Sequence, residues 1–113
     1  MFLVTAMVPA ECLPRQAALD ARVGELAGPE DRVEHLHLAP SPDGGACLTL
    51  FLSQPDAGRS EEAAALLVSR ALAPAADAAA VRWGPAAPLL HVMERLRLGV
   101  ADRDLPSQDP DTA

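Results

Sequence analysis

A dense cluster of turn-forming residues in the middle of the chain constrains how its two halves can fold. Residues 40–45 read Pro-Ser-Pro-Asp-Gly-Gly, and the short segments on either side, residues 33–39 and 46–53, have the patterns of β-strands. Proline and glycine interrupt regular structure, so strand segments that flank such a cluster come together as an antiparallel hairpin. The sequence therefore predicts a β-hairpin at the centre of the chain.

A helical segment precedes the hairpin. Leu19, Val23 and Leu26 recur at positions i, i+4 and i+7, with charged residues between them. This spacing puts the three apolar side chains on one face of a helix, which Gly28 and Pro29 then stop. The pattern predicts an amphipathic helix between Pro14 and Gly28.

A second helical segment follows the hairpin, from Ser60 to about Ala73. Ser60 is the expected N-cap, because Glu61 and Glu62 follow it in the first turn, where the helix dipole favours acidic side chains. The residues expected on its buried stripe recur at helical spacing: they are Ala64, Leu67, Val68, Ala71 and Leu72.

Two more segments complete a set of four predicted strands. Residues 2–8 are apolar on both faces, as expected of a central strand that is covered on both sides. Residues 78–83 are the one stretch before Gly84 that can supply a fourth strand. The order β-α-β-β-α-β predicts an α+β protein with the ferredoxin-like split sandwich topology, in which two helices cover one face of a four-stranded antiparallel sheet.

The C-terminal part of the chain adds a helix and a tail to this plan. Four apolar residues recur at helical spacing beyond the last strand, and we expect them to form an amphipathic interface helix. They are Leu89, Val92, Met93 and Leu96. Residues 101–113 are acidic and almost without large apolar groups, which predicts a disordered tail. Residues 1–100 are therefore expected to form a single domain.

The charge and composition of the chain exclude several functions. Acidic residues outnumber basic ones by 16 to 9, and the basic residues are spread from Arg15 to Arg103, so we expect neither nucleic-acid binding nor attachment to an anionic membrane. Lysine and tyrosine are absent, which excludes a Schiff-base nucleophile, lysine-linked pyridoxal phosphate and a phenolic acid. No cofactor is predicted.

The N-terminal segment and the cysteines indicate the cell compartment. Met1–Ala10 lacks a positively charged start, and no stretch of the chain approaches the about 18 apolar residues of a membrane span. We therefore expect a cytoplasmic protein in which Cys12 and Cys47 are free thiols. The exclusive use of arginine and the abundance of alanine are typical of a GC-rich bacterial genome.

The alternation along the predicted strands separates two sets of side chains. The set expected to face the helices is purely apolar: Val4, Ala6, Leu36, Leu38, Leu48 and Leu50. The opposite set mixes apolar groups with hydroxyls, imidazoles and a thiol: Leu3, Thr5, Met7, His35, His37, Cys47, Thr49 and Phe51. Such a mixture is typical of a sheet face that meets a ligand or another protein.

Two histidines on the opposite face allow more than one interpretation. His35 and His37 lie two residues apart on one strand, and the favoured interpretation is a solvated polar face on an edge strand. A metal site with Cys47 would lack an evident fourth ligand, so we predict no metal. The single tryptophan, Trp83, is interpreted as a sheet-edge or interface anchor.

Two functional hypotheses follow, and the first is favoured. It is a non-catalytic binding or accessory module in bacterial specialised metabolism, acting as a homodimer or as the partner of a larger protein. The residues expected to bind that partner, or a small apolar ligand, are Thr5, Met7, His35, His37, Cys47, Thr49, Phe51 and Trp83. The alternative resembles the dimeric α+β barrel monooxygenases and cyclases, which share this element order and need no cofactor. It would use His35, His37 and Trp83 around an aromatic polyketide-like substrate.

Overall fold

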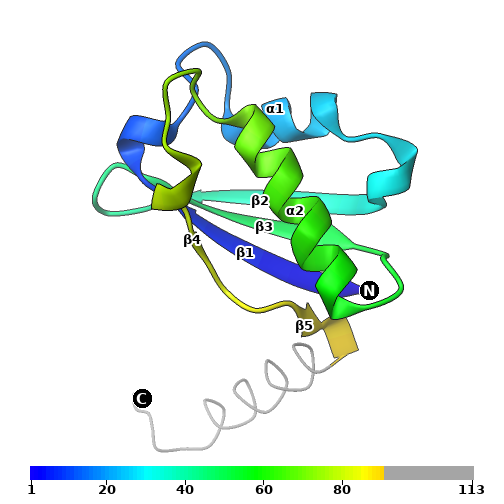
Figure 1. Cartoon of the computed structure of the whole chain (residues 1–113). Helices are drawn as coiled ribbons and strands as arrows, with labels where there is room; N and C mark the ends of the chain where they lie inside the picture. Colours follow the sequence, from blue (N-terminus) through cyan, green and yellow to red (C-terminus); the bar gives the residue numbers. More distant parts are fainter. Residues whose placement is uncertain (91–113) are drawn as a thin grey trace, which may run out of the picture.

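The computed structural model describes residues 1–90 of the 113-residue chain, and within them it has an α+β fold. Two α-helices and an antiparallel sheet make up this part of the chain (Figure 1). The strands are β1 (Phe2–Val8), β2 (Val33–Pro40), β3 (Ala46–Leu52), β4 (Arg82–Trp83) and β5 (Ala87–Pro88). The helices are α1 (Leu19–Leu26) and α2 (Ala57–Ala71), with short 3-10 turns η1 (Ala10–Cys12), η2 (Pro29–Asp31) and η3 (Ala78–Ala80).

The strands follow the order β2-β3-β1-β4 across the sheet. β4 pairs with one end of β1, at Ala6 and Met7, and β5 pairs with the other end, at Phe2 and Leu3. β1 and β3 are paired along their full length, from Phe2 opposite Leu52 to Val8 opposite Ala46. β2 and β3 form the predicted hairpin, whose turn is closed by a hydrogen bond from the Ser41 N–H to the Gly45 carbonyl. Gly44 has a φ of 92° in this turn, a conformation that glycine adopts without steric cost.

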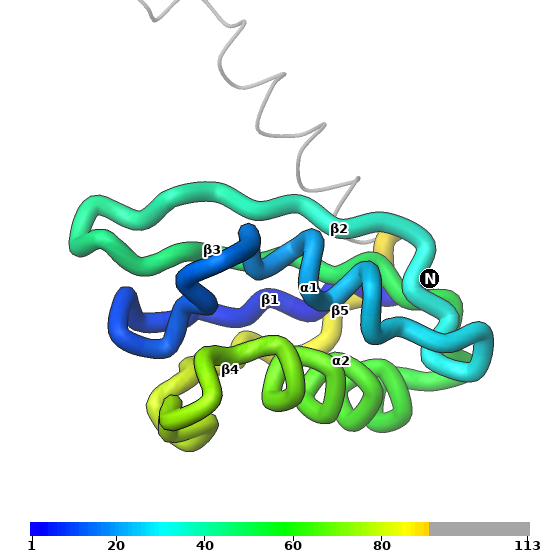
Figure 2. Tube along the Cα trace, turned by 90° about the horizontal axis from the view of Figure 1, so that it is seen from above, coloured from blue at the N-terminus to red at the C-terminus, as the bar shows by residue number. Residues whose placement is uncertain are grey.

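Both helices lie on the same face of the sheet, as Figures 1 and 2 show from two directions. α1 contacts β2, α2 contacts β1, and the two helices contact each other. The strand residues that face them are the predicted ones: Val4, Ala6, Leu48 and Leu50 are fully buried, and Leu36 and Leu38 pack at the margin of the core. The predicted stripe of α2 is also buried as a whole.

The other face of the sheet has no helix over it in the part of the chain that the structure describes. The sequence predicted cover on both sides of residues 2–8, yet Met7 of β1 is 42% exposed. Its neighbours Leu3 and Thr5 are partly exposed. β1 is central in the sheet, but the described residues bury only one of its faces.

The start of α2 differs from the predicted one. The N-cap is Asp56 and the helix begins at Ala57, because the side chain of Asp56 accepts a hydrogen bond from the Arg59 N–H at 2.8 Å. Ser60 is buried within the first turn, where its hydroxyl donates to the Asp56 carbonyl at 3.0 Å. Aspartate and serine can both cap a helix, but here Asp56 caps α2, and the Ser60 hydroxyl bonds the carbonyl of that cap residue instead.

The predicted fourth strand, residues 78–83, is only partly correct. Asp77 accepts a hydrogen bond from the Ala79 N–H and starts the 3-10 turn η3, so only Arg82 and Trp83 pair with β1. Alanine favours helical over extended backbone, which explains why this alanine run does not form a strand. The predicted interface helix falls outside the described residues except for Leu89 and Leu90, and the predicted tail lies wholly outside them.

No helix among residues 1–90 has the length and apolar character needed to cross a membrane.

A leucine pair tests the position of the core. Leu50 is fully buried on β3, and Leu50→Ala should lower the free energy of unfolding by about 2–5 kcal/mol, because it leaves a cavity between the sheet and the helices. Leu66→Ala makes the same chemical change on α2 at a side chain that is 54% exposed, and it should cost less than about 1 kcal/mol. Urea unfolding of both variants measures the difference, and equal losses would contradict this core.

Candidate functional site

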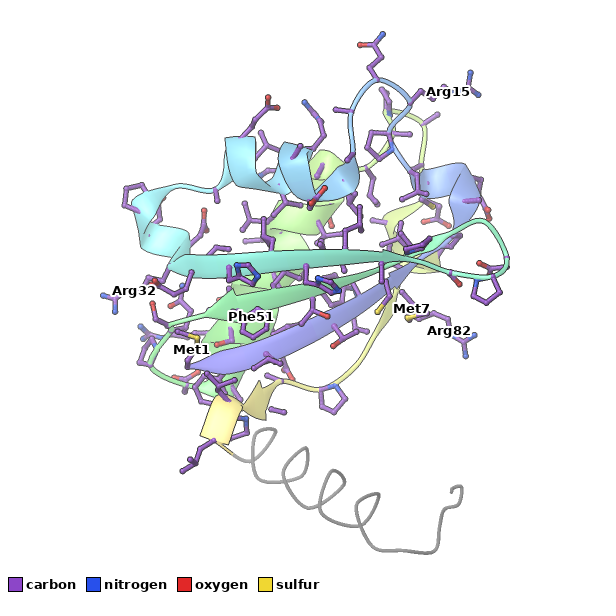
Figure 3. All side chains as sticks on the ribbon, turned by 180° about the vertical axis from the view of Figure 1, so that it is seen from behind. Met1, Met7, Arg15, Arg32, Phe51 and Arg82 are labelled. Carbon is purple, nitrogen blue, oxygen red and sulfur yellow. The ribbon has the colours of Figure 1, made fainter. Side chains whose placement is uncertain are left out.

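The sheet face opposite the helices carries three cross-strand rows of side chains, and we call it the open face. The first row joins His35, Phe51, Leu3 and Ala87, and the second joins His37, Thr49 and Thr5. The third row joins Ala39, Cys47, Met7 and Arg82. Figure 3 shows this face toward the viewer, with Phe51 and Met7 on it and Arg82 beside Met7.

The structure brings seven of the eight predicted binding residues together on the open face. Trp83 is the exception. It pairs with Ala6, whose side chain points to the helices, so the register puts Trp83 on the opposite side of the sheet from His35 and His37. Because paired residues in an antiparallel ladder share a face, Trp83 does not join the two imidazoles in one site.

Residues of the open face that the sequence analysis missed come from its margins. Arg82 lies opposite Met7, and Ala87 lies opposite Leu3. Their positions depend on the register of two-residue strands with β1, which alternation within such short segments cannot reveal. Ala39 lies two residues after His37 on β2, so strand alternation alone puts it on the open face and could have predicted it.

A β-bulge sets the direction of the first histidine. The pairing of β2 with β3 shifts between Val33 and His35, which leaves Glu34 without a partner in the ladder. The ring of His35 packs edge-on against Phe51, with ring centroids 5.3 Å apart and an angle of 65° between the planes. This contact holds one imidazole against an apolar ring at the edge of the sheet.

The surroundings of the imidazoles offer no orienting carboxylate among the described residues. Glu34 is the acid nearest in sequence, and its side chain accepts a hydrogen bond from the Ser53 hydroxyl at 2.8 Å. No ion pair involving His35 or His37 is found within residues 1–90. Residues 1–90 also contain no group of three His, Cys, Asp or Glu side chains close enough to hold a metal ion. The arrangement can form hydrogen bonds and apolar contacts with a partner.

The charge on the open face differs from that of the whole chain. The chain carries 16 acidic residues, yet none lies in the three rows. The ionisable groups of the rows are Arg82, two imidazoles and the Cys47 thiol. Because its rows hold no carboxylate, this face of an acidic protein does not repel a second acidic chain.

The hairpin turn next to this face holds a carboxylate whose protonation is perturbed. Hydrogen bonds from the Gly45 N–H, at 3.0 Å, and from the Ser41 side chain hold the pKa of the Asp43 carboxyl below its ordinary value. Asp43, Met7 and Arg82 line a hollow of about 310 Å³ at the end of the third row. The turn thus adds one negative charge at the corner of the open face.

A second hollow, of about 630 Å³, lies away from the open face. It is formed by the segments that follow η1 and α2, and its apolar lining includes Leu13, Pro14, Leu72 and Pro74. Two arginines line it as well: Arg22 is 3.9 Å from the Glu25 carboxylate, and Arg15 extends away from the body of the protein in Figure 3. Its volume suits a small apolar molecule, but it contains none of the predicted binding residues.

Comparison of the chain with protein-family models, with curated protein sequences and with solved structures found no match.

The perturbed carboxylate predicts a pH dependence. A folded-state pKa below the unfolded one stabilises the protein above the unfolded pKa, and this contribution is lost as the pH falls through the folded pKa. Carbon-detected NMR should therefore find that the pKa of Asp43 in the native protein lies below the ordinary value of an aspartate carboxyl. Asp43→Asn should reduce the acid-induced loss of stability below pH 4. An ordinary pKa for Asp43 would show that the turn hydrogen bonds do not form in solution.

Proposed function

We propose that this protein is a non-catalytic recognition module that docks on another protein, a second copy or a larger partner, through its open face. The observation that supports this most directly is the composition and exposure of the three rows. They combine apolar groups, hydroxyls and imidazoles in rows that hold no carboxylate and that no described helix covers. Surfaces of this kind are typical of protein interfaces.

We also propose that the fold is the ferredoxin-like split sandwich. The element order β1-α1-β2-β3-α2-β4, the strand order β2-β3-β1-β4 and the two helices on one face all agree with that topology. In this arrangement the helices complete the core from one side only, so the open face is free for docking.

The size of the open face indicates how strong such docking can be. Strands of seven residues are about 23 Å long, and four strands at about 4.8 Å spacing span roughly 15–20 Å. Their projected area is therefore about 400 Å², which is roughly half of the 800 Å² that each partner buries in a stable interface. Docking through this face alone should be weak, and a tight complex would need a further element of the chain.

No orienting group lies beside the imidazoles among residues 1–90, and this supports recognition over catalysis. A histidine that acts as a general base needs a partner that fixes its tautomer and a reacting atom within hydrogen-bond reach. The described surroundings of His35 and His37 provide an aromatic edge and a hydroxyl-bearing row. These groups suit contacts with a partner surface.

A substitution at the centre of the open face tests the proposal. Thr49→Arg puts a long charged side chain between His37 and Thr5, where a docked partner would have to bury it. Ser69→Arg makes a comparable change on the exposed side of α2 and serves as the matched control. In sedimentation equilibrium, the mass of the wild type and of the control should rise above 11.8 kDa with concentration, whereas that of Thr49→Arg should not.

Two outcomes would contradict parts of this proposal. A wild-type mass of 11.8 kDa at every concentration would exclude the homodimer. Equal self-association of all three proteins would exclude the open face as the docking surface.

The histidines are tested separately from the centre of the face. The double change His35→Gln and His37→Gln retains hydrogen-bonding groups, so it should preserve the melting temperature. It should weaken association by about 1–3 kcal/mol, which is roughly a 5-fold to 150-fold change in Kd. A thousandfold loss of turnover on an aromatic polyketide-like substrate with unchanged binding, equal to about 4 kcal/mol, would favour an enzyme instead.

A further inference from the structure

The described part of the chain ends at the margin of the open face. β5 pairs with β1 so that Ala87 lies opposite Leu3 in the first row, and the Leu89 N–H donates to the Met1 carbonyl at 2.8 Å. Leu90, the last described residue, is 69% exposed. The chain therefore leaves the structure from the edge of the sheet next to the first row, with a large apolar side chain in solvent.

The sequence that follows is suited to cover this face. Val92, Met93, Leu96 and Val100 recur at helical spacing, with Glu94, Arg95 and Arg97 between them. Twelve residues in a helix extend about 18 Å. The distance from the edge strand at β4 and β5 across β1 and β3 to β2 is about 14 Å, at about 4.8 Å per strand spacing. A segment that starts at this edge is thus long enough to cross the face.

We propose that residues 89–100 pack their apolar stripe on the open face of the same chain and compete there with the protein partner. This inference rests on the proposed function, because it assigns a second occupant to the same surface. Tethering favours the segment of the same chain over that of another, since a short tether gives an effective concentration in the millimolar range. At micromolar protein concentration, the segment of the same chain has an advantage of roughly a thousandfold over the same segment of another chain, so self-association of the wild type should require much higher concentrations than that of a variant without the stripe.

The charges of the open face and of the chain beyond residue 100 also favour residues 89–100 as the occupant of this face. The open face has Arg82, His35 and His37 and no carboxylate in its rows. Beyond the apolar stripe, the chain has four aspartates and one arginine: Asp102, Asp104, Asp109, Asp111 and Arg103. Arg82 can attract a tail of this composition, and no carboxylate in the three rows repels it.

The consequence is a recognition surface that its own chain regulates. Partner binding requires the competent state with the segment displaced, so the apparent affinity falls in proportion to the population of that state. A factor that removes the segment, such as a change to its apolar stripe, should strengthen partner binding. The same change should expose the face.

The labelling rate of the Cys47 thiol measures directly whether residues 89–100 cover the open face. It lies on the open face between Ala39 and Met7 and is partly exposed in the described structure. Cys12 is buried, and its thiol contacts the Asp77 carbonyl, so its labelling reports on unfolding of the domain. Labelling with N-ethylmaleimide, followed by intact-mass measurement and peptide mapping, measures both thiols in the full chain.

Matched glutamine variants separate the apolar stripe from the polar side of the segment. Val92→Gln with Leu96→Gln removes stripe residues, and Arg95→Gln with Arg97→Gln is the control. We expect Cys47 to be labelled at least tenfold faster in the stripe variant and within twofold of the wild-type rate in the control, with Cys12 protected in both. The stripe variant should also self-associate at lower concentration than the wild type. Equal Cys47 rates in the three proteins would overturn the proposal.

A cross-linking measurement applies if the stripe variant does not fold. Single cysteines are placed at residues 92–97 of the otherwise native chain, and each variant is oxidised with diamide at a concentration at which it is monomeric. Intrachain disulfides with Cys47 should form from the positions of the apolar stripe and not from residues 94, 95 and 97. Disulfides between chains alone, or equal yields at all positions, would overturn the proposal. Suppose that Thr49→Arg loses association while Cys47 is labelled at the same rate in the stripe variant and in the wild type. This outcome would overturn the inference about residues 89–100 and leave the proposed function intact.

Discussion

The pairing of β1 with β3 is the interaction on which the rest of the structure depends. Its seven matched residue pairs, from Phe2 and Leu52 to Val8 and Ala46, fix which side chains face the helices. A shift by one residue would exchange the two sets completely, because side chains alternate along a strand. Burial of Val4, Leu48 and Leu50 against α1 and α2 stabilises this register over its alternatives.

The same register determines the open face. Every second residue of β1 and β3 belongs to the core, so the residues between them line up in rows on the other side. These rows mix apolar groups with hydroxyls, imidazoles and a thiol, unlike the purely apolar set on the helix side. β1 is central in the sheet and has apolar residues on both faces, a pattern that is typical of strands covered on both sides, yet the described residues cover only one of its faces.

Much of the candidate site could be predicted from alternation alone. Positions two residues apart in a strand share a face, so alternation predicts that His35 and His37 lie together and on the same face as Thr49 and Phe51. Trp83 and Arg82 could not be placed. Their faces depend on how β4 pairs with β1 across nearly the whole chain, and a two-residue strand has no periodicity from which to infer a register.

The sequence by itself determined the hairpin, the two amphipathic helices and the division of strand residues into two faces, because each follows from local periodicity and turn chemistry. Only the tertiary structure decided where α2 begins, how much of residues 78–83 is strand, and which face each margin residue joins. These features depend on competition between nearly equivalent local choices, Asp56 against Ser60 or turn against strand. Local hydrogen bonds to Asp56 and Asp77 select the start of α2 and the turn η3, whereas the pairing of β4 and β5 with the distant β1 decides the face of each margin residue.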